Sequence, residues 1–154
     1  MKFSTREDIE APIAHVFAQV SDFAGFERSA LRRGADVRRL DHGPFQTGSQ
    51  WDAAFKFRGR DRKMQLTLTM LDAPEMYQLE ARSDGLICET LVELVALSPR
   101  RTRLSVMMNL QPRSLTARVL LQSMKLAKGK LTKRFKARVL EFAEDIEDDY
   151  RKQG

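Results

Sequence analysis

The sequence predicts an α+β fold in which one antiparallel sheet of seven strands packs against a long C-terminal helix. Three observations lead to this prediction: an alternating segment at the N-terminus, strand-like segments separated by turn residues in the middle, and an amphipathic segment at the end. The 154 residues fit a single domain, 1–154, because domains most often have about 100–150 residues.

The N-terminal segment predicts one strand followed by two short helices. Residues on one face of the strand are Phe3, Thr5, Glu7 and Ile9, which alternate with polar residues. Pro12 suits the first turn of a helix because it lacks a backbone N–H, and Asp22 can cap a second helix that we expect to end at Gly34. His15 lies off the apolar stripe of the first helix, so we expect it at the surface.

The middle of the chain predicts six further strands, over residues 36–40, 49–58, 63–71, 76–83, 87–97 and 102–111. Gly59 and Asp84-Gly85 are hairpin signals, so we expect antiparallel connections rather than helical crossovers. Alternation predicts one apolar face, formed by Trp51, Ala53, Phe55 and Phe57, then Met64, Leu66, Leu68 and Met70, and finally Leu104, Val106, Met108 and Leu110.

The C-terminal segment predicts one helix from Ser114, its cap, to residue 152. Its apolar positions recur every three or four residues, as Leu120, Met124, Ala127, Leu131, Phe135, Val139, Phe142 and Ile146. Packing this stripe onto the sheet would bury both apolar surfaces. A helix of this length would extend about 58 Å, so we expect its acidic end to overhang the domain.

Composition excludes several classes of protein. The longest apolar runs have only a few residues, against about 20 for a membrane-spanning helix, and the N-terminal segment lacks the apolar centre of a secretory signal. Cys88 is the only cysteine, so the usual disulfide and zinc patterns are absent and a cytoplasmic location is expected. We find no phosphate loop, dinucleotide fingerprint or metal-spaced carboxylate pair, and therefore expect neither a metal nor another cofactor.

Positive charge is concentrated near the C-terminus. The net charge is +6, and residues 125–138 hold seven bases and no acid, whereas residues 141–149 hold six acids and no base. A solvated helix face is the simplest interpretation, but the segment would also permit weak contact with an anionic membrane. No aromatic residues are interleaved for base stacking, so no specific nucleic-acid partner is predicted.

Two residues are candidates for acid/base chemistry. Glu7 shares a face with apolar residues, where burial would favour the protonated carboxyl and so suit a general acid or base. A solvated carboxylate at the mouth of a cavity is the simpler interpretation. Tyr77 lies early in a strand whose apolar face points inward, and its hydroxyl would orient a ligand.

Three local features accompany this order of elements. They are Ala11-Pro12 leading into Val16-Phe17, the stretch Val20-Ser21-Asp22-Phe23, and Leu97-Ser98-Pro99 followed by Arg101-Thr102-Arg103-Leu104. With the long last helix, they resemble the helix-grip (SRPBCC) superfamily, which includes START lipid-transfer domains, plant pathogenesis-related proteins and bacterial polyketide cyclase/dehydrase-like proteins. The resemblance implies a curved sheet wrapped around the last helix, with a cavity that holds a lipophilic molecule. Because members bind varied ligands and a minority are enzymes, the fold alone selects no chemistry.

The leading hypothesis is therefore a binding or carrier domain for a hydrophobic small molecule, such as a lipid, a quinone or a polyketide-like compound. Candidate cavity-lining residues are Phe26, Leu31, Trp51, Phe55, Phe57, Leu68, Tyr77, Leu79, Val106, Met108, Leu120 and Met124. Arg28, Arg32 and Arg33 would attract an anionic head group. Two alternatives remain open: a cyclase/dehydrase-type enzyme using Glu7 with Tyr77, and a membrane- or RNA-associated module acting through the basic helix. The ligand and the oligomeric state also remain open.

Overall fold

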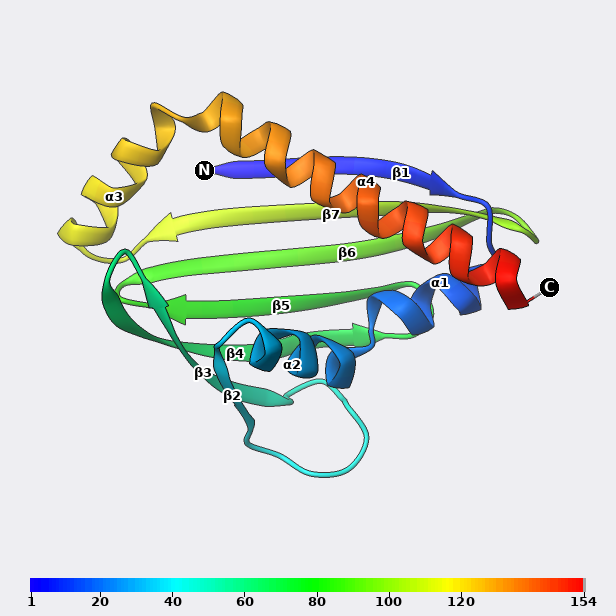
Figure 1. Cartoon of the computed structure of the whole chain (residues 1–154), viewed down its shortest axis with the longest axis horizontal. Coiled ribbons are helices and arrows are strands. Elements are labelled where there is room, and N and C mark those ends of the chain that lie inside the picture. The colour runs from blue at the N-terminus through cyan, green and yellow to red at the C-terminus, as the bar shows by residue number, and fades with distance from the viewer. Residues whose placement is uncertain (154) are drawn as a thin grey trace.

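An antiparallel sheet of seven strands is the framework of the structure, a computed structural model that describes residues 1–153 (Figure 1). The strands are β1 (Lys2–Ile9), β2 (Asp36–Arg39), β3 (Gln50–Phe57), β4 (Arg60–Asp72), β5 (Met76–Ser83), β6 (Leu86–Ser98) and β7 (Arg101–Pro112). The helices are α1 (Ile13–Val20), α2 (Phe23–Arg32), α3 (Leu115–Lys125) and α4 (Lys128–Gln153). Within the described residues no helix has the length and apolarity needed to cross a bilayer.

The strand order is β1-β7-β6-β5-β4-β3-β2, so the first and last strands are neighbours. Helices α1 and α2 connect β1, at one edge of the sheet, with β2 at the other edge. The predicted seven-strand antiparallel arrangement is confirmed. Two of its hairpins use turn residues with positive φ, at Arg58-Gly59 and at Asp84-Gly85, and this turn geometry matches the right-handed twist of the strands.

The inner face of the sheet carries the apolar rows that pack against the helices. Trp51 lies opposite Leu66, and Tyr77 lies opposite Val92, which in turn faces Val106. The prediction that Met70 belongs to this face is wrong. An irregularity between Leu68 and Met70 shifts the register, so that Leu71 lies opposite Tyr77 and packs against the core while Met70 is exposed.

The predicted single C-terminal helix is divided into α3 and α4, which meet at an angle (Figure 1). Leu126 caps the first helix, and Gly129 lies in the first turn of the second. A straight helix of about 58 Å would overrun strands of at most 13 residues, which span about 43 Å. The break lets the buried Ala117 and Leu121 of α3 and Ile146 of α4 all reach apolar neighbours.

The acidic end of α4 does not overhang, which corrects the prediction from sequence. Ile146 belongs to the core and Tyr150 packs against it, because α1 lies beneath this part of the helix. The ring of His15 lies 5.0 Å from that of Tyr150, and its Nε2 lies 3.4 Å from a carboxylate oxygen of Asp149. His15 is therefore largely covered, and the expectation of a surface histidine is also wrong.

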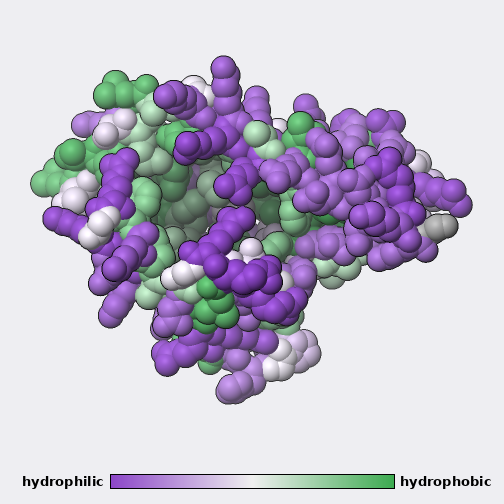
Figure 2. Space-filling model, viewed as in Figure 1, coloured by the Kyte–Doolittle hydropathy of each residue, from purple (hydrophilic) through white to green (hydrophobic). Residues whose placement is uncertain are grey.

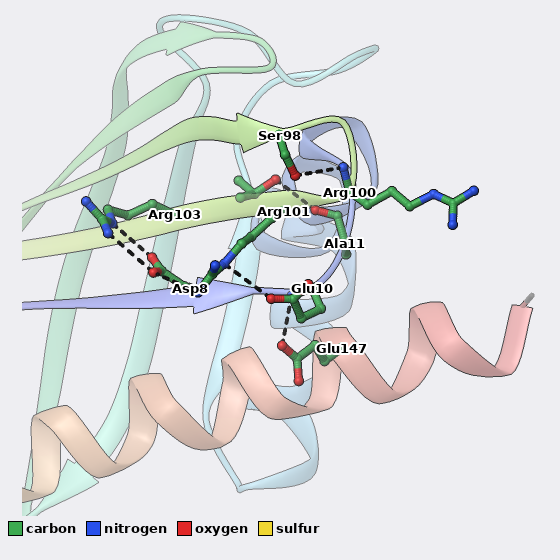
Figure 3. A network of polar contacts seen from close by, with 9 residues as sticks. Asp8, Glu10, Ala11, Ser98, Arg100, Arg101, Arg103 and Glu147 are labelled. Atoms are coloured by element: carbon green, nitrogen blue, oxygen red, sulfur yellow. Dashed lines mark hydrogen bonds and ion pairs between the residues drawn. The ribbon is translucent and has the colours of Figure 1, made fainter.

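A polar network fastens this end of α4 to strands β1 and β7 (Figure 3). The Asp8 carboxylate accepts a hydrogen bond of 2.9 Å from Arg103, which holds the pKa of that carboxyl below its usual range, and lies 3.5 Å from Arg101. Arg101 also pairs with Glu10 at 3.2 Å. The backbone N–H of Glu10 donates to Glu147 at 2.8 Å. Three segments distant in sequence thus meet at one polar cluster.

We predict that the end of α4 is required for stability. Ile146→Ala should lower the free energy of unfolding by about 2–5 kcal/mol, because a fully buried isoleucine leaves a cavity when truncated. Leu140→Ala, on the same helix but 43% exposed, is the control and should cost about 0.5–1 kcal/mol. Urea denaturation measures both values, and equal losses for the two variants would contradict the placement of this helix.

Candidate ligand cavity

An apolar cavity of about 280 Å³ lies between α2 and the inner face of the sheet. Helix α2 contributes Phe23, Phe26, Glu27 and Ala30, the segment after it contributes Ala35, and the strands contribute Val37, Trp51, Ala53, Met64, Leu66 and Leu79. Almost all of the surface that faces the cavity is apolar. Such a space favours an apolar occupant over water.

Small side chains and incomplete helix cover create this space. Ala30, Ala35 and Ala53 border the cavity with only a methyl group each, so the helix and the sheet do not fill the volume between them. Helix α4 packs chiefly on β1, at the opposite edge of the sheet from β2 and β3, so α2 is the helix that covers the region of the cavity. In the space-filling view the molecule is hollowed between α3, α4 and α2, with hydrophobic residues in the depth of the hollow (Figure 2).

A second recess of about 570 Å³ adjoins the cavity. It shares Phe26, Ala30 and Ala35 with the cavity, and Phe55 forms part of its wall. The exposed cations Arg33 and Lys56 also border it, together with Ser29 and Gly34. The apolar cavity therefore adjoins a recess with positive charge at its rim.

Among the described residues, Glu27 is the one charged residue that borders the apolar cavity. Its Oε1 accepts a hydrogen bond of 2.6 Å from the indole Nε1 of the buried Trp51, which links α2 to β3. A carboxylate accepts several hydrogen bonds, so this bond leaves capacity for a donor group on a ligand.

An aromatic cluster forms the wall beside this hydrogen bond. The ring of Phe23 lies 5.1 Å from that of Tyr77, 5.3 Å from that of Phe45 and 5.7 Å from that of Trp51. Phe45 stacks on Trp51 with ring centroids 5.9 Å apart, although Phe45 comes from the loop between β2 and β3. Offset and edge contacts of this kind stabilise aromatic pairs beyond the area they bury.

Asp41 holds this loop in place. Its carboxylate accepts hydrogen bonds from Arg39 at 2.9 Å, from the Ser49 hydroxyl at 2.8 Å and from the Gln50 backbone N–H at 3.1 Å. The hydrogen bond from Arg39, assisted by those from Gln50 and Ser49, holds the pKa of the Asp41 carboxyl far below its usual range. The Arg39 guanidinium also lies 4.1 Å from the centre of the Phe45 ring, so Asp41 positions the aromatic wall through Arg39.

The twelve residues that the sequence suggests as cavity liners occupy different places. Phe26, Trp51 and Leu79 border the cavity, and Phe55 borders the recess. Leu68 and Tyr77 are buried in the core, and Val106 packs against it. Met108 borders a separate cleft of about 260 Å³. Leu120 and Met124 are half-buried on α3, whereas Leu31 and Phe57 are exposed. Of the three arginines suggested to attract a head group, Arg33 borders the recess, while Arg28 and Arg32 are exposed on α2.

Sequence reasoning missed Phe23 and Glu27, which border the cavity, and Phe45, which belongs to the aromatic cluster beside it. Phe23 follows the Asp22 cap directly, and its apolar character at a helix start was the available signal. Phe45 lies among glycine, proline and polar residues, a context that predicts only a turn. Glu27 gave no signal, because its partner Trp51 lies 24 residues away in sequence.

The structure does not bring Glu7 and Tyr77 together. Glu7 lies on β1, opposite Leu104, and two strands separate β1 from β5, a distance of about 14 Å at about 4.8 Å per strand. The Tyr77 hydroxyl donates a hydrogen bond of 2.7 Å to the carbonyl oxygen of Val20, and burial raises its pKa. Tyr77 thus fastens the end of α1 to β5.

This architecture, an open antiparallel sheet with a long C-terminal helix and a cavity beneath a short helix, is the helix-grip fold of START-like proteins. Similar solved structures include the Zhui aromatase/cyclase from Streptomyces sp. R1128, with a TM-score of 0.69, 13% identity and coverage of 100% of this chain and 98% of that chain. A START superfamily protein from Mycobacterium smegmatis has a TM-score of 0.56 and 14% identity, over 86% of this chain and 95% of that chain.

The protein Ara h 8.0201 is a third similar structure, with a TM-score of 0.54 and 15% identity over 92% of this chain and 98% of that chain. No family model and no curated protein matches the sequence. At these identities the similarities establish the fold, which agrees with the resemblance found in the sequence.

We predict that Asp41→Asn destabilises the protein at neutral pH and that the difference from wild type narrows in acid. The lowered pKa means that the charged carboxylate stabilises the folded state above its ordinary pKa of about 3.9, and that this stabilisation is lost as pH falls toward the folded value. Urea midpoints at pH 7 and pH 3 measure the effect. Asp36→Asn, which removes an exposed carboxylate on β2, is the control; a difference for Asp41→Asn that does not change with pH would contradict the assignment.

Proposed function

We propose that this protein binds a hydrophobic small molecule, of lipid, quinone or polyketide-like type, in the cavity between α2 and the sheet. The observation that carries the proposal is the cavity itself, which is almost wholly apolar and adjoins a larger recess. Small-molecule sites are typically concave and mostly apolar, with volumes of about 300–1,000 Å³ and a few polar groups that fix orientation. The cavity together with its recess has these properties.

Charge gives the proposed ligand an orientation. Arg33 and Lys56 stand at the recess and favour an anionic group there, whereas the Glu27 carboxylate disfavours a second negative charge in the cavity. The apolar body of the ligand therefore lies against the aromatic wall, and its anionic end points to the rim. A hydroxyl group on the inner part would donate to Glu27.

We predict that filling the cavity weakens binding. Ala53→Phe places a ring in the space between α2 and the sheet, so the affinity for the fluorescent probe 1-anilinonaphthalene-8-sulfonate should fall about tenfold, a loss of about 1.4 kcal/mol. Ala54→Phe is the matched control, because neighbouring residues of a strand point to opposite faces and Ala54 does not border the cavity. Equal affinities for the two variants would show that the probe binds elsewhere.

Native mass spectrometry of the purified protein, before and after organic extraction, tests whether a ligand is retained. Displacement of the probe by fatty acids, quinones and polyketides then ranks the ligand classes. No retained ligand and no displacement by any of these compounds would refute the proposed function.

We predict that the recess favours anionic ligands. The double variant Arg33→Gln with Lys56→Gln should weaken the anionic probe about fivefold, as expected for two exposed ion pairs of roughly 0.5 kcal/mol each, and should leave the neutral dye Nile red unchanged. Arg28→Gln, exposed on α2 but away from the recess, is the control. Fluorescence titration gives each affinity, and an equal effect on the two dyes would argue against a charge contribution.

A cyclase/dehydrase-type enzyme is the second candidate function, and Glu27 is the observation that favours it. A carboxylate in a largely apolar cavity is a suitable general acid or base, and its bond to Trp51 fixes its position. We predict that any turnover of a polyketide-like substrate, followed by mass spectrometry, is lost in Glu27→Gln while the affinity for Nile red is retained. Turnover that survives in this variant would exclude Glu27 as the acid/base group.

A further inference from the structure

Helix α3 exposes apolar side chains on the face that points away from the sheet. The exposed fractions of Leu115, Val119 and Leu126 are 79%, 63% and 92%. The spacing of four and then seven residues places them along one side of the helix, whereas Ala117 and Leu121 on the other side are buried. The helix is therefore apolar on two sides, and only one side is covered by the rest of the described chain.

The surroundings of this apolar side are strongly basic. Residues 113–138 contain nine lysines and arginines and no acid, and all nine are exposed. Among the described residues none of the nine forms an ion pair with a carboxylate, in contrast to Arg101 and Arg103 of β7. Arg118, three residues after Leu115, is its neighbour on the surface of α3, and Lys125 ends the helix directly before Leu126.

Helix α3 stands at one end of the molecule, and the acidic part of α4 lies at the other end (Figure 1). About 20 Å of helix separates Lys128 from Glu141, the first acid of α4, at about 1.5 Å per residue. Hydrophobic residues gather at the surface over α3 with hydrophilic residues between them (Figure 2). The acids of α4 are thus too far from α3 and from the first turn of α4 to neutralise the bases there, since exposed charges are screened beyond about 10 Å at 0.1 M salt.

We propose that α3 and the start of α4 form a docking surface for an anionic lipid bilayer. Leu115, Val119 and Leu126 enter the boundary between head groups and acyl chains, while the flanking lysines and arginines contact anionic head groups. Both properties are those of interfacial helices, which combine an apolar stripe with basic residues.

Charge complementarity favours a bilayer over other occupants. The lysines and arginines could contact the phosphates of a nucleic acid. The exposed leucines and valine, however, offer neither an aromatic stacking surface nor a hydrogen bond to its nucleobases. A second copy of the chain would bring nine like charges onto the same surface. The docking surface requires no occupied cavity, so it can be tested whether or not the proposed function holds.

Co-sedimentation with vesicles tests the proposal on the full chain. Vesicles of phosphatidylcholine with 30% phosphatidylglycerol should bind the protein at least about tenfold more tightly than vesicles of phosphatidylcholine alone, and added salt should weaken the binding. Leu115→Ser, Val119→Ser and Leu126→Ser together should reduce binding about tenfold or more, and Leu126→Ser alone should reduce it measurably. A second set, Arg118→Gln, Lys125→Gln and Lys128→Gln, should reduce the preference for anionic vesicles.

The control is Val95→Ser with Leu97→Ser, which removes exposed apolar residues from the end of β6 and should leave vesicle binding unchanged. Urea midpoints show that each variant remains folded. Equal binding to neutral and anionic vesicles, or binding that the serine variants do not weaken, would overturn the proposal. It would also be overturned by RNA binding that survives the serine variants in the absence of vesicle binding, or by self-association that those variants abolish.

Discussion

The width of the sheet relative to one helix is the constraint on which the rest of this structure depends. Seven strands at about 4.8 Å give an inner face about 29 Å wide along its curve, whereas a helix with its side chains is about 10 Å across. Helix α4 covers the side near β1, so the remaining inner face must be covered by α1, α2 and the loop that carries Phe45. Because these elements are short, their cover is incomplete.

Two hydrogen bonds from buried aromatic residues of the sheet hold helices α1 and α2 in place. Tyr77 donates to Val20 at the end of α1, and Trp51 donates to Glu27 in α2. Each aromatic ring contributes apolar area to the core while its polar group fastens a helix to the sheet. The helices are therefore held against the sheet at defined points, and the space between those points stays open because alanines border it.

The sequence predicted those parts of the fold that depend on local chemistry. The hairpins at Gly59 and Asp84-Gly85 follow from turn residues that tolerate positive φ, and the end of α2 follows from Gly34. The bulge in β4 could not be predicted, because alternation continues through Leu68 and Met70 although the register does not. Regular periodicity also hid the break near Leu126, which depends on the length of the sheet that the helix must match.

The candidate site was less predictable than the fold. Strand alternation identified Trp51 and Leu79, because inward-facing apolar residues of a sheet are easy to recognise. Phe45 and Glu27 depend on contacts across the fold, the first with Trp51 through a loop and the second with the same indole through a hydrogen bond. The prediction that the acidic end of α4 overhangs the domain was wrong for a similar reason. Its carboxylates suggested exposure to solvent, but Ile146 belongs to the core and Tyr150 packs against it.

The two ends of the molecule use positive charge differently, and this difference follows from the same constraint. At the end where α4 meets β1 and β7, Arg101 and Arg103 pair with Asp8 and Glu10, so their charges are matched within the fold. At the other end, the break before α4 turns α3 across the end of the sheet, where one side of it buries Ala117 and Leu121. Its other side has no further layer to pack against within the described residues. Positive charge is therefore not spread evenly: the nine bases of residues 113–138 form no ion pair among the described residues, and the exposed Leu115, Val119 and Leu126 lie in the same part of the surface.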